Sequence, residues 1–163
     1  MYISTLLVSG TDLFAGGGGA FFSSDNGTSW TTINNGLTNI NVISMSVNSN
    51  YVFAGTSGSG VFSTTNNGQQ WFPANSGMSG TIVTALGVSG SNVFAGTQGG
   101  AYISANNGTN WTSVSNGMRY LLCQGIFSFS NNLYCATWGS GVAVSTDNGS
   151  SWFNSNNGIT NAI

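Results

Sequence analysis

Charged residues are almost missing from this sequence of 163 residues. It has one arginine, three aspartates and no lysine, glutamate or histidine, so 2% of its residues are charged, against roughly 25% in an ordinary soluble domain. Binding of nucleic acid needs clustered basic side chains to neutralise phosphates, and none can form here. No apolar run reaches the ~18 residues of a membrane span. The sequence therefore predicts neither a nucleic-acid partner nor membrane insertion.

The same shortage argues against catalysis. Glycoside hydrolysis needs two carboxylates facing one sugar, and the chain has only Asp12, Asp25 and Asp147. A serine or cysteine nucleophile needs a neighbouring base, and no histidine, lysine or glutamate is present to serve. Zinc sites draw on histidine, and two cysteines alone cannot complete a tetrahedral site. We therefore expect a protein that is not an enzyme and that binds neither metal nor cofactor.

What the chain does contain is enough apolar material for a folded core. Hydrophobic residues make up 40% of it and aromatic residues 12%, whereas disordered chains combine high charge with few aromatics. Because net charge is low, solubility must rest on Asn, Ser, Thr and Gly or on attached sugar, or else the protein is not meant to stay dispersed. A surface without titratable groups is nearly indifferent to pH and salt. This composition favours an extracellular or cell-surface location. Met1–Gly10, however, lacks the charged start of a signal peptide.

One short stretch occurs four times. It reads SSDNGTSW at Ser23–Trp30 and returns in copies that end at Trp71, Trp111 and Trp152. A period of about 40 residues is typical of four-stranded propeller blades. We predict one all-β, propeller-type repeat domain over 1–163, with four tandem antiparallel blades of about 40 residues. The expected blades are about 1–37, 38–78, 79–118 and 119–159, with a connecting tail at 160–163.

Each repeat can be divided into four short strands. Alternating apolar residues indicate a half-buried first strand, and the residues expected in equivalent places are Leu6 and Val8, Met45 and Val47, Leu86 and Val88, and Phe127 and Phe129. The second strand carries one large residue followed by small ones, as in LFAG at Leu13–Gly16. The repeated stretch is the turn between the third and fourth strands, and its tryptophan is expected to begin the fourth. Pro73 falls in a fourth strand, where an outer edge tolerates a missing N–H.

The pattern S-x-D-x-G-x-x-W resembles the Asp-box (BNR) repeat of sialidases, xyloglucan-active hydrolases, sortilin-type receptors and photosystem assembly propellers. The resemblance covers essentially the whole chain. Its residues are Ser23, Asp25, Gly27 and Trp30; Thr64, Asn66, Gly68 and Trp71; Ser104, Asn106, Gly108 and Trp111; and Ser145, Asp147, Gly149 and Trp152. Asn replaces the acid twice and keeps an oxygen that can close the same turn. The resemblance implies a structural turn on the face away from an active site. A sialidase-type site would need several arginines, and Arg119 is alone.

The fourth repeat departs from the pattern at Arg119, Tyr120 and Trp138. Arg119 and Tyr120 fall in the link before its first strand, and Trp138 falls in the loop after its second strand. These loops share the propeller face that usually binds ligand. Two exposed aromatic rings beside one arginine could stack on a sugar and bond its hydroxyls. A contact to the next repeat or subunit, or simple loop packing, is the alternative interpretation.

Two further features concern covalent chemistry. Four N-x-[ST] sequons make Asn26, Asn107, Asn110 and Asn148 candidate N-glycosylation acceptors. Several sequons are expected by chance in a chain rich in Asn, Ser and Thr, and NG is also good turn chemistry. Cys123 and Cys135 lie in the first two strands of the fourth repeat, with Cys123 out of register, so two buried free thiols are favoured over a disulfide.

The leading functional hypothesis is a non-catalytic structural or adhesion module that associates with copies of itself head to tail. The last residues, Ile159–Ile163, resemble Leu37–Asn41, which lead into the next first strand. A closed four-blade ring, an eight-blade ring of two chains, a filament and a fragment of a longer chain all remain open. A carbohydrate-binding propeller, with glycans as partners, is the main alternative, and a protein-binding receptor-type propeller is a third.

Overall fold

The computed structural model describes residues 2–159, which contain no helix and so no helix that could cross a membrane. These residues form four four-stranded antiparallel sheets, each ordered as in the sequence. This confirms the predicted all-β class with four-stranded repeats. Blade 1 consists of β1 (Ile3–Ser9), β2 (Asp12–Gly17), β3 (Ala20–Ser23) and β4 (Thr31–Thr32). Blade 2 consists of β5 (Val42–Asn48), β6 (Tyr51–Thr56), β7 (Val61–Thr64) and β8 (Phe72–Pro73).

The second half of the chain repeats this arrangement. Blade 3 consists of β9 (Val83–Ser89), β10 (Asn92–Thr97), β11 (Gly100–Ser104) and β12 (Thr112–Ser113). Blade 4 consists of β13 (Cys123–Phe129), β14 (Asn132–Thr137), β15 (Gly141–Ser145) and β16 (Phe153–Asn154). In every blade the fourth strand has two residues, so the outer edge that could pair with another chain is short.

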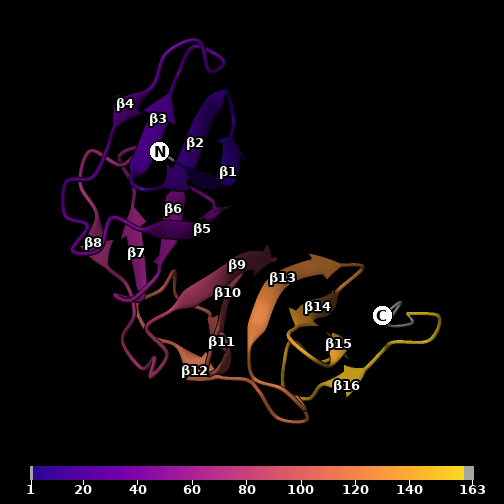
Figure 1. The fold of residues 1–163 in the computed structure, drawn as a ribbon. Coiled ribbons are helices and arrows are strands. Elements are labelled where there is room, and N and C mark those ends of the chain that lie inside the picture. Colours follow the sequence, from indigo (N-terminus) through magenta and orange to yellow (C-terminus); the bar gives the residue numbers. More distant parts are fainter. Residues whose placement is uncertain (1, 160–163) are drawn as a thin grey trace.

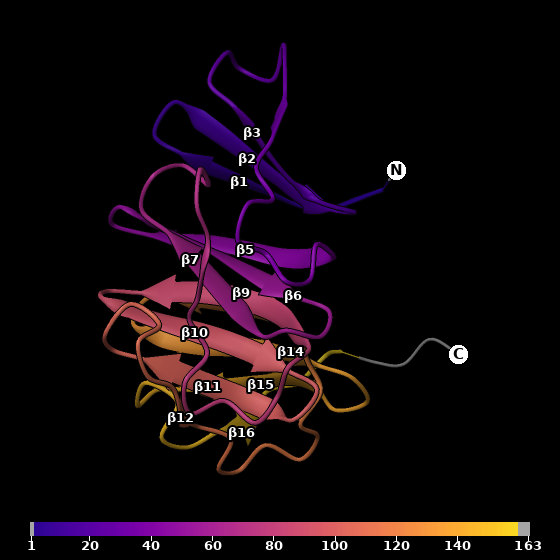
Figure 2. The same cartoon turned by 90° about the vertical axis from the view of Figure 1, so that its left-hand side faces the viewer.

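The blades follow one another along an open arc (Figure 1). Their first strands form its inner line, since β1 contacts β5, β5 contacts β9 and β9 contacts β13. Figure 2 shows the first three blades stacked one above the other. Blades 1 and 4 are the two ends of the arc and lie apart in Figure 1. A four-blade ring closed within one chain, one of the arrangements that the sequence left open, is therefore not formed.

The apolar core is divided among the three joints between neighbouring blades. Each joint holds one large aromatic residue that is fully buried and points to the following blade: Phe14, Phe53 and Phe94. Small residues sit beside it on the facing second strand, namely Ala54, Ala95 and Cys135. The alternation of large and small residues along these strands lets the sheets approach closely, as expected for close-packed interiors.

The register of blade 4 corrects the sequence prediction by one residue. Ile126, not Phe127, pairs with Cys135, because the hairpin turn is the two-residue pair Ser130–Asn131, both with positive φ. A slip of one residue moves a side chain to the opposite face of a sheet. Phe127 and Phe129 therefore lie exposed on the free face of blade 4. Ile126 is therefore the residue of blade 4 that is equivalent to Leu6, Met45 and Leu86 in the first strands of the other blades.

A disulfide joins Cys123 of β13 to Cys135 of β14, whereas two free thiols were favoured from the sequence. A bulge between Cys123 and Gly125 pairs Cys123 with Thr137 and turns its side chain to the same face of the sheet as that of Cys135. The two Cα atoms lie 6.1 Å apart, within the range of disulfides. Both cysteines are fully buried and take the places of Val83 and Ala95 in blade 3, so the disulfide fills the same part of the core.

Candidate functional site

Each repeated stretch closes a compact turn between the third and fourth strands. In blade 1 the Gly27 N–H donates to Ser23 Oγ (2.9 Å), and the Ser23 hydroxyl donates to Asp25 (2.7 Å). The Ser29 N–H and hydroxyl both donate to the Asp25 carboxylate, at 2.9 and 2.6 Å. Asn26 and Gly27 have φ of 56° and 82°, a region that Asn and Gly accept most readily. The turn is thus closed by its own side chains.

The asparagine copies make the same bonds. Asn66 Oδ1 accepts from the Thr64 hydroxyl (2.7 Å) and the Gln70 N–H (3.1 Å). Asn106 Oδ1 accepts from the Ser104 hydroxyl and the Asn110 N–H, each at 2.9 Å. In blade 4, Asp147 repeats the arrangement of blade 1, with Ser145 and Ser151 as donors. One side-chain oxygen is therefore enough for the turn, and the negative charge is not required.

The serine donors hold the turn carboxylates in the ionised form. Hydrogen bonds from Ser29, and then from Ser23, lower the pKa of Asp25 from its ordinary 3.8 to about 2. Hydrogen bonds from Ser151 and Ser145 lower the pKa of Asp147 in the same way. Because the pKa is lower in the folded state, the ionised carboxylates stabilise the fold above the unfolded-state pKa, and this contribution is lost as the pH falls through the folded-state pKa.

We therefore expect the free energy of unfolding to fall as the pH is lowered from 3.8 towards 2. The double variant Asp25→Asn/Asp147→Asn copies the turns of blades 2 and 3, so it should fold at neutral pH and lose most of this dependence. Urea denaturation followed by circular dichroism across this range measures both chains. An equally steep loss in the double variant would contradict the assignment.

The tryptophans of the second, third and fourth turns contact the preceding blade, and in all four blades the fourth strand starts one residue after the tryptophan. The indole N–H donates to a backbone carbonyl of that blade, from Trp71 to Ile33 (2.7 Å), Trp111 to Ala74 (2.7 Å) and Trp152 to Val114 (2.6 Å). The exposed fractions of these three side chains are 1%, 4% and 4%, whereas Trp30 of blade 1 is 41% exposed. The repeated tryptophan is therefore a contact between blades, and no blade within residues 2–159 covers Trp30.

The structure brings two of the three predicted ligand residues near each other. The Trp138 side chain is 70% exposed, and the backbone N–H of this residue donates to the Leu122 carbonyl (3.0 Å). The Tyr120 ring borders the loop that carries Trp138. It lies about 4.0 Å from the position that a Cβ atom would take on Gly139, the next residue of that loop. Arg119, next to Tyr120 in the chain, is also exposed. A cavity of about 360 Å³ adjoins this loop and is lined by Thr137, Gly139, Gly141, Asn156 and Ile159.

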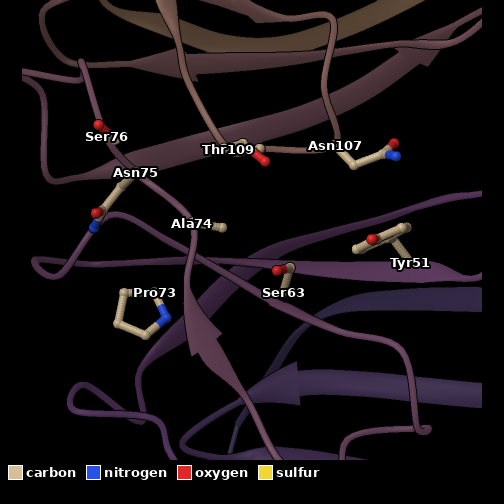
Figure 3. Close-up of a pocket in the computed structure, with 9 residues that line it drawn as sticks. Tyr51, Ser63, Pro73, Ala74, Asn75, Ser76, Asn107 and Thr109 are labelled. Atoms are coloured by element: carbon tan, nitrogen blue, oxygen red, sulfur yellow. The ribbon is translucent and has the colours of Figure 1, made fainter.

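A second cavity of about 360 Å³ opens between blades 2 and 3 and was not predicted from the sequence. Figure 3 shows Tyr51 and Asn107 on one side of it and Asn75 on the other. Its other lining residues are Ser63, Pro73, Ala74, Ser76, Gly108 and Thr109, so it is uncharged. The one available signal was Tyr51, an aromatic residue where the other blades begin β2, β10 and β14 with Asp or Asn.

The remaining candidate groups are dispersed. Asp12 accepts a hydrogen bond from Asn67 of blade 2 (3.0 Å), while the other two carboxylates lie in turns of different blades. Within residues 2–159, no group of three or more His, Cys, Asp or Glu side chains is placed to hold a metal ion. Among the sequon asparagines, Asn26, Asn110 and Asn148 are exposed and Asn107 is half-buried.

Solved structures with the same fold are numerous, though distant in sequence. YCF48 bound to D1 peptide matches with a TM-score of 0.68 and 16% identity over 93% of this chain and 52% of that chain. An ancestral GH74 enzyme matches with a TM-score of 0.73 and 20% identity, over 92% of this chain and 23% of that chain. The extracellular domain of the hybrid two component system BT4673 from B. thetaiotaomicron matches with a TM-score of 0.73 and 16% identity, over 93% of this chain and 21% of that chain. This chain thus spans about half the length of YCF48 and less than a quarter of the other two.

No curated protein sequence matches the chain significantly. A family model, the DUF6242 beta propeller domain, matches residues 37–161, about three quarters of the sequence. That span runs from the link after blade 1 to the end of blade 4, so it contains three of the four four-stranded sheets. The chain therefore belongs to the DUF6242 beta propeller domain family.

Proposed function

We propose that this chain is a non-catalytic structural module that associates with copies of itself head to tail through its two end blades. The observation that carries the proposal is a pair of exposed apolar faces. Leu6 and Val8 are exposed on blade 1, and Phe127 and Phe129 are exposed on blade 4. Faces of this kind are covered at every joint inside the chain. Exposed apolar patches on an otherwise folded domain mark interaction surfaces.

An extracellular or cell-surface location is part of the proposal. The Cys123–Cys135 disulfide supports it, because such bonds persist in oxidising compartments and are rare in the cytosol. The near absence of charged side chains supports it further, since a surface held in solution by Asn, Ser and Thr changes little with salt. The extracellular domain of BT4673 shows that this fold is used outside cells.

The proposal is tested by the mass of the purified chain in solution. Light scattering after size-exclusion chromatography, with negative-stain microscopy of the same fractions, should show rings or filaments of several chains. Each would contain whole multiples of the 16.7 kDa chain. A single-chain mass at all concentrations up to the solubility limit would refute self-association.

Carbohydrate binding is a second candidate function. The observation that favours it is the exposed pair Tyr120 and Trp138 beside an uncharged cavity. Aromatic rings of this kind stack on the apolar faces of sugars while neighbouring polar groups bond the hydroxyls. A glycan array with the wild-type chain and Trp138→Ala tests it: saturable binding that the substitution abolishes would support a lectin, and no binding by the wild type would refute it.

A further inference from the structure

The three joints inside the chain share one set of contacts. Besides the indole bond described above, the backbone N–H of the tryptophan donates to a carbonyl of the preceding blade: Trp71 to Asn35 (2.9 Å), Trp111 to Ser76 (2.8 Å) and Trp152 to Asn116 (2.9 Å). The next residue along each accepting segment is a glycine with φ near 90°: Gly36, Gly77 and Gly117. A Cβ on any of these glycines would collide with the carbonyl oxygen of the tryptophan. Each joint thus has a tryptophan half and a glycine half.

Blade 1 carries a tryptophan half without a partner. The Trp30 side chain is exposed, and its indole N–H has no hydrogen-bond partner among residues 2–159. Ile3 is also exposed on this face, whereas the residues in its place at the other three blades are fully buried: Val42, Val83 and Cys123. Leu6 and Val8 extend the same apolar face.

Blade 4 carries the matching glycine half. Gly158 has φ of 81°, as at the internal joints, but a Cβ placed on it would meet no atom within 4 Å in the described part of the chain. The carbonyls of Ser155 and Asn157 hold the places of the acceptors at the other joints. Ile159 is exposed where Met118 is buried, and Tyr134, stacked on Phe127, is only half-buried where Phe94 is fully buried.

We infer that blade 4 of one chain docks on blade 1 of a second copy, and that two such joints close one eight-blade ring. This inference rests on the head-to-tail association proposed above and names its contacts. The Trp30 indole N–H donates to the carbonyl of Ser155 in the second copy, and the Trp30 backbone N–H donates to that of Asn157. The joint is heterologous, so it makes a closed ring when its rotation allows. Two copies supply eight blades, within the usual four to eight of propellers, and three copies would exceed that range.

The side chains of the free faces fit this joint. Phe127 stands where Leu7, Ser46 and Gly87 stand in the other blades. A Cβ on Gly87 would collide with the backbone of Ile126, so the joint between blades 3 and 4 leaves no room for a side chain there. The joint between blades 1 and 2 accommodates Leu7 in its core. The two sheets at the ring-closing joint are therefore spaced like those of blades 1 and 2, with room for a large side chain between them.

The test is Gly158→Asn in the full chain. Asn accepts positive φ at small cost, and the described residues of the same chain leave room for it, but its Cβ would collide with the Trp30 carbonyl of the second copy. Overpacking of this kind is expected to weaken each joint about tenfold or more, and both joints of the ring carry it. The matched control is Gly90→Asn, at φ 58° with no atom of residues 2–159 within 4 Å and away from both end faces.

Sedimentation velocity should give twice the 16.7 kDa chain mass for the wild type and Gly90→Asn, and one chain mass for Gly158→Asn. Leu6→Asp, on the opposite half, should also give single chains. An equimolar mixture of Leu6→Asp and Gly158→Asn keeps one intact joint and should form mixed pairs. If the wild type forms pairs that neither variant disrupts, or assemblies of more than two chains, the proposed eight-blade ring is wrong while self-association stands. A wild type that stays a single chain would overturn the proposed function as well.

Discussion

Replacing Trp71 with alanine is expected to lower the free energy of unfolding by about 3 to 5 kcal/mol. The side chain is 1% exposed and packs in the core between blades 1 and 2. Its removal leaves a cavity and also leaves the Ile33 carbonyl without the indole N–H. Urea denaturation followed by tryptophan fluorescence and circular dichroism measures the loss.

Trp30→Ala is the matched control, because it removes the same side chain from the equivalent turn. Trp30 is 41% exposed and contacts no preceding blade, so we expect its loss to cost less than about 1.5 kcal/mol at dilutions where the chain is monomeric. Equal losses in the two variants would show that the tryptophan stabilises its own turn rather than the joint between blades.

Gly36→Ala is expected to destabilise the chain by about 3 kcal/mol. Gly36 has φ of 92°, which strains any residue with a Cβ. The added methyl group would also collide with the Trp71 carbonyl and the Gln70 side chain. Both effects fall on the joint between blades 1 and 2, so the melting temperature and the urea midpoint should fall together.

Gly158→Ala separates the two causes. Gly158 has a similar φ of 81°, but the described residues leave the space around it empty. In the monomeric chain its substitution should cost only the backbone strain, about 1 to 2 kcal/mol. The difference between the variants then measures the collision at the joint. If Gly36→Ala costs no more than Gly158→Ala, the joint between blades 1 and 2 has room for a methyl group beside the Trp71 carbonyl.

Several elements of this structure follow from local sequence. The turns with Asn26-Gly27 and Ser130–Asn131 need positive φ, and short polar residues or glycine supply it without tertiary help. The hydrogen bonds of Ser23 and Asp25 span only a few residues, so the repeated motif could be assigned to a turn from spacing alone. Whether that turn makes the chain a member of the Asp-box group stays a prediction.

The candidate binding features were less accessible to sequence reasoning. Tyr120 and Trp138 could be assigned to neighbouring loops because the repeat places both at one end of blade 4. The cavity beside Tyr51 could not, since its lining comes from blades 2 and 3 together. Its shape depends on how two sheets pack, and no single segment encodes that distance.

By itself, the sequence determined the repeat, the all-β class, the tight turns and the near absence of charge, because each depends on neighbouring residues or on composition. Only the tertiary structure decided the register of β13, the disulfide of Cys123 with Cys135 and the different exposure of Trp30 and Trp71. The pairing of β13 with β14 is shifted by one residue from the expected register, which puts Ile126 rather than Phe127 opposite Cys135. A bulge of the kind found in all four blades pairs Cys123 with Thr137. Similar turns therefore acquire different roles, because what a tryptophan contacts depends on whether another blade lies beside it.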